Sequence, residues 1–455
     1  MNLLFRLSDG NRRLELLRTS KSARPPRPSL LPDPTKPAPM QLGDIVLTLH
    51  DTRNKRLAEH VLPATHMTFF DRPLKPSGEV IGRIATWMDA VRSLDVSIPP
   101  QATRLTLARH ALDASSKSLL VPLLELDPRA DPSRRGRRIP KAPTQLHGER
   151  GDASKSFDIV ILGDGFQKQE MKLFGARARF LVSELLAIEP FKSLSDRINV
   201  HAVFTPSKDS GVTNCPHPGV RKNTFFEIEG NFKDAGYAGY FGTHRTDIID
   251  DAAESVAPRE LIDLVIVLVN SAIYGGRGDR ESRTCYVPIV ADDELFINLA
   301  VHEAAHAICG LTDEYISDIA PPIVGFKAPN FATEAERLTN EVCWRGLAHG
   351  FELDQGVFRA THRIGDPLDH TAGSPVLPNG LGDMLGLFWG CSFIEPTPPS
   401  DGFMPHRFDV RGGGYYRPMA RCKMRKLSDP FCRVCANALR LAIEEAAAVG
   451  SRSSR

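Results

Sequence analysis

The amino-acid sequence predicts a mixed α/β (α+β) domain built on a mixed sheet, with a small β-rich domain ahead of it. Two strand-like segments, residues 158–166 and 199–205, flank apolar residues at helical spacing from about 168 to 188. This order favours a βαβ unit. Residues 264–269 are a fully apolar run, which is typical of a buried strand. Nearer the N-terminus, residues 44–50 alternate with period two, as half-buried strands do.

Length and composition indicate an ordinary globular protein. A chain of 455 residues can bury a large core and hold two or three domains. The formal net charge of +2 gives no reason to expect nucleic acid or a membrane surface as a partner. Eight cysteines in this length do not indicate a disulfide scaffold. No apolar run reaches the roughly 18 residues of a membrane span, and composition leaves the oligomeric state open.

The distribution of prolines, charges and apolar residues divides the chain into four segments. Asp9 and Arg12 interrupt the first apolar stretch, so we expect no signal peptide and a cytoplasmic location. Prolines and basic residues dominate from Ser20 onward, which is typical of disorder. A second stretch of prolines surrounds the basic run 134–138 and reads as a solvated linker. The predicted segments are a disordered N-terminus (1–40), a β-rich domain (41–126), a linker (127–156) and the main domain (157–448).

The most informative stretch is residues 296–315, FINLAVHEAAHAICGLTDEY. On a helix, His302 and His306 lie one turn apart on the same face, so both imidazoles can reach one metal ion. Glu303 projects beside them, where a carboxylate can take a proton from a metal-bound water. The rest of the helix is apolar nearly all round and is therefore expected to be buried. A surface helix with solvated His and Glu is the alternative, but a metal would satisfy all three buried groups.

The flanks of this helix strengthen the metal-site interpretation. Acidic residues at 292–294 favour a helix start through the macrodipole, and Gly310 falls where a helix needs a left-handed residue to end. The chain then turns into Asp313 and Glu314, either of which could supply an oxygen ligand. We expect Asp313 to be the third ligand. It is the first residue after the turn whose side-chain oxygen binds zinc well, and its short side chain suits a tight turn. Glu314 could then hydrogen-bond a ligating histidine.

The string His302-Glu303-x-x-His306-x-x-x-Gly310-Leu311-x-Asp313-Glu314-Tyr315 resembles the signature of the IgA-peptidase family of zinc metallopeptidases. Two other motifs are similar to the family: LGDGF at 162–166 before a helix, and Asn270-Ser271-x-x-Tyr274-Gly275-Gly276. The resemblance covers roughly residues 157–439. It implies a metzincin-like, zincin-like catalytic domain after a β-sandwich-like domain, one catalytic zinc ion and a protein or peptide substrate. Family members are often secreted, which conflicts with the expected cytoplasmic location.

We therefore expect a zinc-dependent metalloendopeptidase. Zinc held by His302, His306 and Asp313 would lower the pKa of its bound water to about 7. Glu303 would take the proton of that water as it attacks the scissile carbonyl and pass it to the leaving amine. The alternative is a zinc-binding, catalytically weak module that recognises a protein or glycan on the same fold. An intact Glu303 argues against that alternative, since a structural zinc site needs no base.

Three further roles are expected in the main domain. Tyr416 is a candidate for oxyanion stabilisation, with Tyr415 and Tyr315 as competitors. In zinc proteases with a methionine turn, a methionine forms an apolar floor beneath the metal, and Met424 is the candidate; the alternative is an ordinary core methionine. Pro288 suggests that residues 284–288 form an edge strand that pairs with substrate. This last prediction assigns Tyr286 and Val287 to substrate binding.

Two features of the C-terminal part leave questions open. Trp389 stands where the family usually has a glutamate, which makes substrate preference less certain than the chemistry. Cys422, Cys432 and Cys435 could form a disulfide, bind a second zinc ion or be buried thiols, and the sequence shows no obvious fourth ligand.

Overall fold

The structure is a computed structural model of the chain. It describes residues 2–8, 12–20, 43–62, 66–73, 80–87, 91–96, 98–112, 116–128, 143–148, 156–232, 238–315, 327–339, 341–347, 360–362, 385–389, 391, 415–419 and 421–448.

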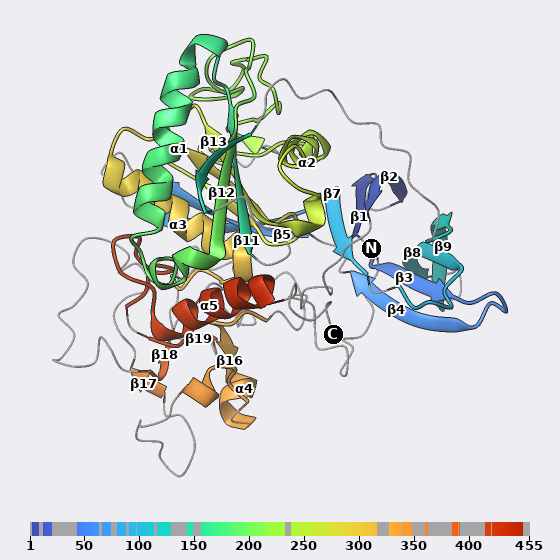
Figure 1. The fold of residues 1–455 in the computed structure, drawn as a ribbon. Coiled ribbons are helices and arrows are strands. Elements are labelled where there is room, and N and C mark those ends of the chain that lie inside the picture. The colour runs from blue at the N-terminus through green and yellow to red at the C-terminus, as the bar shows by residue number, and fades with distance from the viewer. Residues whose placement is uncertain are drawn as a thin grey trace, which may run out of the picture.

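A mixed, eight-stranded sheet lies at the centre of the main domain (Figure 1). Its four interior strands β12, β11, β13 and β15 are parallel, whereas β10 at one end and β14, β5 and β6 at the other are antiparallel to their neighbours. The mixed α/β class is therefore confirmed. In sheet order the strands are β10 (Thr144–His147), β12 (Ile198–Val203), β11 (Phe157–Asp164), β13 (Ile262–Val269), β15 (Thr284–Pro288), β14 (Arg277–Asp279), β5 (His66–Pro73) and β6 (Val80–Trp87).

The two faces of this sheet are covered by different helices. Along β11, Ile159 and Ile161 contribute to the core shared with α1 (Met171–Leu185), α3 (Asp293–Cys309) and α5 (Arg433–Ala448). The alternate residues Val160 and Leu162 face a second core, which contains α2 (Thr246–Ala253). Because both faces are covered, β11 and β13 are buried along their whole length. Helix α1 connects the parallel strands β11 and β12, which is the predicted βαβ unit.

Smaller elements complete the C-terminal half. A four-stranded sheet has the order β16-β19-β18-β17, and α4 follows β16 directly in the chain. Short 3₁₀ turns occur at Lys168–Glu170, Lys192–Arg197, Arg259–Leu261 and Arg345–Leu347. The remaining elements are β16 (Ala332–Thr333), α4 (Glu334–Thr339), β17 (Ala360–His362), β18 (Leu387–Trp389) and β19 (Tyr415–Arg417).

The N-terminal part contains two sheets that share one hydrophobic core. One has the order β4-β3-β8-β9 and the other the order β2-β1-β7. Leu3, Phe5 and Leu7 of β1 pack in the same core as residues of β3 and β8. The strands are β1 (Asn2–Ser8), β2 (Arg13–Ser20), β3 (Ile45–His50), β4 (Arg56–Leu62), β7 (Val91–Asp95), β8 (Arg104–Leu112) and β9 (Ser118–Leu126).

The prediction that residues 1–40 are disordered is wrong for residues 2–8 and 12–20. These form β1 and β2, which pair with each other from Asn2 opposite Ser20 to Ser8 opposite Arg13. The physical reason is the alternation of Leu3, Phe5 and Leu7, whose side chains are buried on one face of β1. The proline-rich part of the predicted segment, residues 21–40, lies outside the described residues.

Two of the expected domain boundaries also need correction. Strand β10 lies inside the expected linker 127–156, yet it pairs with β12 at one end of the central sheet. The hairpin β5–β6 lies inside the expected β-rich domain 41–126, yet β5 pairs with β14 through Phe69 and Gly278. Both strands join the sheet through pairing partners far away in the sequence, which local composition does not show.

The prediction that residues 284–288 form an edge strand is wrong. Strand β15 pairs with β13 on one side and with β14 on the other, so neither edge is open to a peptide. Pro288 is the last residue of the strand and does not place it at an edge of the sheet. Tyr286 and Val287 are fully buried, and the Tyr286 ring lies 4.5 Å from the Arg277 guanidinium carbon. The predicted substrate-binding role of these two residues therefore loses its basis.

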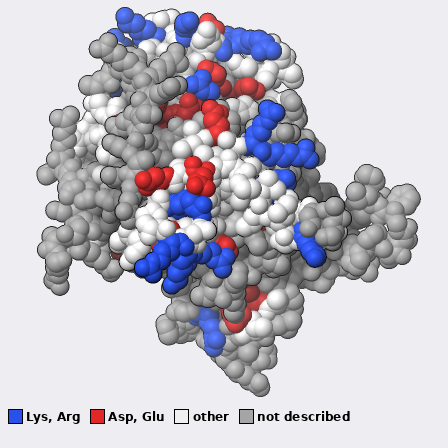
Figure 2. All heavy atoms as spheres, turned by 90° about the vertical axis from the view of Figure 1, so that its right-hand side faces the viewer, with Lys and Arg blue, Asp and Glu red and all other residues white. Residues whose placement is uncertain are grey.

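The described surface shows no preference for one sign of charge on the face in Figure 2, where acidic and basic side chains are interspersed. Among the described residues, no helix has both the length and the apolar character needed to cross a membrane.

The LGDGF turn at the end of β11 is anchored by a buried carboxylate. Asp164 accepts backbone hydrogen bonds from Phe226 (2.8 Å) and Ile228 (3.3 Å), which hold the loop after β12 against the sheet. Burial raises the pKa of Asp164 from 3.8 to about 6, although these backbone N–H groups act in the opposite direction. The ionised form of Asp164 is therefore less favourable in the folded protein than in the unfolded chain.

This shift predicts a pH-dependent stability. Because the folded pKa is raised, the contribution of Asp164 is most favourable below pH 3.8 and is lost as the pH rises through about 6. Relative to Asp164→Asn, the free energy of unfolding of the wild type should fall by about 3 kcal/mol across that window, at about 1.4 kcal/mol per pKa unit. Denaturant unfolding of both metal-free proteins over this pH range measures the difference. A difference that stays constant with pH would contradict the assignment.

Candidate metal centre

Helix α3 begins and ends where the sequence predicts. The side chain of Asp292 accepts a hydrogen bond from the Leu295 N–H (2.8 Å), and Asp293 and Glu294 occupy the first turn. At the other end Gly310 is left-handed (φ 66°, ψ 37°), and its N–H donates to the His306 carbonyl. The last turns of α3 are buried, so the three ionisable residues of the motif lie inside the core.

His302, His306 and Asp313 converge in the core, and we call them the His₂Asp cluster. Nε2 of His302 and Nε2 of His306 each lie 3.2 Å from Oδ1 of Asp313, and 3.1 Å from each other. All three side chains are at most 2% exposed. An ion placed just above the centre of such a triangle is about 2 Å from each corner, which is the length of Zn–N and Zn–O bonds. The arrangement can therefore hold a metal ion.

Backbone carbonyl groups orient the two imidazole rings. Nδ1 of His306 lies 2.6 Å from the Leu311 carbonyl oxygen, and Nδ1 of His302 lies 3.2 Å from that of Lys423. When Nδ1 donates its hydrogen to a carbonyl, a neutral ring presents the lone pair of Nε2 toward Asp313. Three electron-rich atoms then face the same point, as metal ligands do. The expectation that Glu314 orients a histidine is wrong, because backbone carbonyls do so.

The electrostatics of the cluster keep Asp313 ionised. In the absence of a metal, burial by itself would raise the pKa of Asp313, but the charge of a protonated His306 and hydrogen bonds donated by the Nε2–H groups of both histidines lower it to about 2. Asp313 is thus available as an anionic oxygen ligand near neutral pH.

The loop that carries Asp313 is held by residues far along the chain. Asn330 pins it on both sides of Thr312: its Oδ1 accepts from the Thr312 N–H (2.9 Å), and its Nδ2 donates to the Thr312 carbonyl (2.8 Å). The Glu314 N–H donates to the Met424 carbonyl (2.7 Å), and the Cys391 thiol donates to the Asp313 carbonyl (3.3 Å). The positioning role of Asn330 arises from contacts 18 residues away in the chain, which its local sequence does not show.

Met424 lies in the core that contains α3, and its floor role stays a prediction. Its side chain is fully buried in the core that contains α3, and its carbonyl binds the loop of Asp313. The preceding carbonyl, that of Lys423, contacts His302. Residues 423 and 424 therefore contact His302 and the loop that carries Asp313 through their backbone.

Glu303 is fully buried beside the glycines of the Asn270–Gly276 motif. A Cβ atom on Gly276 would lie 2.6 Å from Oε1 and 2.9 Å from Cγ of Glu303. A Cβ on Gly278 of β14 would lie 2.4 Å from the Glu303 carbonyl oxygen and 2.5 Å from Cβ of His306. Only residues without a side chain allow the sheet to approach α3 this closely. The sequence marked this loop by its glycines but did not show what they face.

The three candidate tyrosines have different surroundings. Tyr416 is 7% exposed on β19, where its backbone lies opposite Ala332 and Trp389. The Tyr415 ring stacks on Phe331 with centroids 5.3 Å apart. Tyr315 is buried directly after the acidic pair. The oxyanion role of Tyr416 stays a prediction.

Comparison with known families agrees with this geometry. Residues 146–321 match the model of the family described as IgA Peptidase M64. The resemblance to the IgA-peptidase family is confirmed. The matched segment runs from β10 to just beyond Tyr315 and so includes the whole His₂Asp cluster. It supports peptidase activity on a protein or peptide substrate. No curated protein gives a significant match to the chain.

The geometry predicts that Asp313→Ala weakens metal binding far more than a change at Glu303. Two histidines rarely retain zinc against competition, whereas Glu303 is not part of the cluster. Titration of zinc-loaded protein with a chromophoric chelator measures the affinity, with Glu303→Gln as the control of similar burial. We expect a loss of at least about 100-fold for Asp313→Ala. Equal affinities in the two variants would remove Asp313 from the ligand set.

Proposed function

We propose that the protein is a zinc-dependent metalloendopeptidase. The observation that carries this proposal is the convergence of three ligand atoms, 3.1 to 3.2 Å apart, at a helix that also carries the buried Glu303, the residue after His302. The donor set of two imidazole nitrogens and one carboxylate oxygen is typical of catalytic zinc, since it leaves a fourth position for water or substrate. The zincin-like class of the main domain and the β-sandwich-like class of the N-terminal domain belong to the same proposal.

Zinc bound by the His₂Asp cluster would supply Lewis acidity and lower the pKa of a water in its open position to about 7. His302, His306 and Asp313 would hold the ion, and the carbonyls of Leu311 and Lys423 keep the imidazoles turned toward it. Glu303 would accept the proton of the attacking water and later give it to the leaving amine. Tyr416 would donate a hydrogen bond to the developing oxyanion.

A weakly active recognition module on the same fold is less well supported. A zinc site that only stabilises a fold has no use for a carboxylate base, yet Glu303, which follows the ligand His302 in the chain, is completely buried. Burying a carboxylate is costly, which argues for a chemical role.

Replacing Glu303 by Gln tests the proposed chemistry. Gln keeps the size of the side chain but cannot accept a proton, so the rate of peptide hydrolysis should fall by about 10²–10⁴. Cleavage of a denatured protein mixture, with and without a chelator, provides the assay, and zinc content should be unchanged. Substantial chelator-sensitive activity in this variant would remove Glu303 as the general base.

Gly276→Ala tests whether the close approach of the Asn270–Gly276 loop positions Glu303. The three atoms nearest the new Cβ would all belong to the Glu303 side chain, which would have to move. We expect zinc to remain bound and the rate to fall by roughly 10- to 100-fold, as a displacement of about 1 Å can cause. Gly175→Ala on α1 is the matched control, because its Cβ would meet nothing closer than 3.5 Å. Full activity of Gly276→Ala would show that Glu303 needs no such support.

A further inference from the structure

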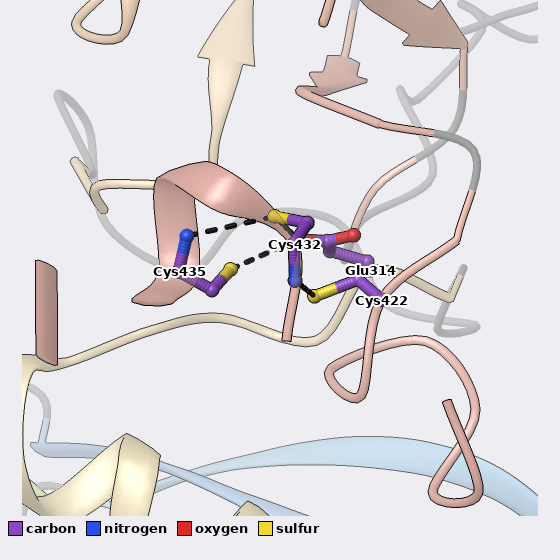
Figure 3. Close-up of side chains that lie close together, drawn as sticks. All are labelled: Glu314, Cys422, Cys432 and Cys435. Atoms are coloured by element: carbon purple, nitrogen blue, oxygen red, sulfur yellow. Dashed lines mark hydrogen bonds between the residues drawn. The ribbon is translucent and has the colours of Figure 1, made fainter. Parts of the chain in front are cut away.

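We propose that Glu314, Cys422, Cys432 and Cys435 form a second metal site, which binds a structural zinc ion. We call these four residues the Cys₃Glu cluster. Figure 3 shows their side chains directed toward one another from three separate segments. Their ligand atoms all lie within 4.8 Å of one another. The inference does not depend on the proposed peptidase activity.

The cluster closes a junction between elements distant in the sequence. Glu314 follows α3, Cys422 lies in the turn before Met424, and Cys432 and Cys435 lie at the start of α5. Oε1 of Glu314 lies 3.3 Å from Sγ of Cys435 and 3.9 Å from Sγ of Cys432. Sulfur ligands around tetrahedral zinc are about 3.8 Å apart, given Zn–S bonds of about 2.3 Å. Small side-chain rotations would therefore bring all four atoms to an ion.

The backbone around the cluster favours thiolates. The Cys432 N–H donates to Sγ of Cys422 at 3.4 Å, and the Cys435 N–H donates to Sγ of Cys432 at 3.5 Å. Cys432 also stands at the N-terminal end of the 16-residue helix α5, where the helix dipole stabilises negative charge. Backbone N–H groups that point at sulfur in a Cys-x-x-Cys turn are what a thiolate ligand requires.

The charged and polar groups around the Cys₃Glu cluster are compatible with a bound metal ion. Three thiolates and one carboxylate around Zn²⁺ leave a net charge of −2, which is costly in a core. Arg417 is 3% exposed, and its positive charge interacts with both Glu314 and Cys422. Asn330 also donates to Oε1 of Glu314 at 3.1 Å. These two groups reduce the cost of burying the negative charge.

A disulfide explains the cluster less well than a metal does. None of the eight cysteines of the chain forms a disulfide in the structure. Any one disulfide among Cys422, Cys432 and Cys435 would leave a third thiol and the Glu314 carboxylate buried together, with nothing to account for their convergence. Sulfur-rich, tetrahedral sets of donors are typical of zinc or iron–sulfur sites, and a mixed set of thiolates and one carboxylate fits zinc.

The proposed ion would also stabilise the His₂Asp cluster, through the loop that carries Asp313 and Glu314. Asp313 and Glu314 are neighbours in the chain, and one faces the histidines while the other faces the cysteines. Binding Glu314 to the turn of Cys422 and to α5 would hold the backbone of Asp313 in place.

Cobalt substitution of the full-length protein tests the proposal directly. Thiolate ligands give Co²⁺ an intense sulfur-to-metal charge-transfer band in the near ultraviolet, which a site of two histidines and one aspartate lacks. We expect two zinc ions per wild-type chain by elemental analysis, and this band after exchange with cobalt. A reduced wild-type protein with one zinc ion and no such band would overturn the proposal, as would a disulfide within the cluster found by mass spectrometry.

Variants assign the two ions. His306→Ala should lose one zinc ion and keep the charge-transfer band, whereas Cys435→Ser should lose the band or shift it strongly. Cys343→Ser, which changes an exposed thiol outside the cluster, should keep both ions and the band. If Cys435→Ser does not fold, the wild-type spectrum and metal content decide alone. Loss of the band in His306→Ala with retention in Cys435→Ser would refute the assignment.

Discussion

The buried contact between Asp313 and the two histidines of α3 is the constraint on which the site depends. Burying an imidazole or a carboxylate in a core costs free energy when the group has no partner. Grouped together, two imidazoles and a carboxylate can form ion pairs or bind one cation, which offsets that cost. The two Nε2 atoms and Oδ1 of Asp313 lie 3.1 to 3.2 Å apart, which requires α3 to be buried with one face toward the loop that carries Asp313. The sheet, the surrounding helices and the loop after Gly310 all contribute to that requirement.

The loop from Gly310 to Tyr315 connects two clusters of ligating groups. Gly310 ends α3 in the left-handed conformation, and Asn330 then holds the backbone of Thr312 through two hydrogen bonds. Beyond this point the side chains of Asp313 and Glu314 diverge, one toward the histidines and the other toward the cysteines. A displacement of this short loop would therefore affect both clusters at once, which is why so many distant groups contact it.

On the side of the site that faces the sheet, close packing depends on two glycines, which have no side chain. Gly276 and Gly278 allow the chain of β14 to lie against Glu303 and His306 at distances that any Cβ would prevent. Strand β14 also covers the edge of β15, so a substrate cannot pair with β15 by strand addition. The glycines thus serve close packing against α3, and the substrate must contact other parts of the site.

The sequence by itself determined the elements whose signals are local. The four-residue spacing of His302 and His306 matches the helical period, Gly310 marks the helix end, and apolar runs mark β11 and β13 as buried. Only the tertiary structure decided features that depend on distant partners: β1 pairs with β7, β15 lies inside the sheet, and Glu314 joins three cysteines more than one hundred residues later. The directions of the Asp313 and Glu314 side chains were also decided by the tertiary structure. The hydrogen bond from the Thr312 N–H to Asn330 and that from the Glu314 N–H to the Met424 carbonyl set the backbone there. Local periodicity records which face of an element is apolar, but it carries no information about which distant segment meets that face.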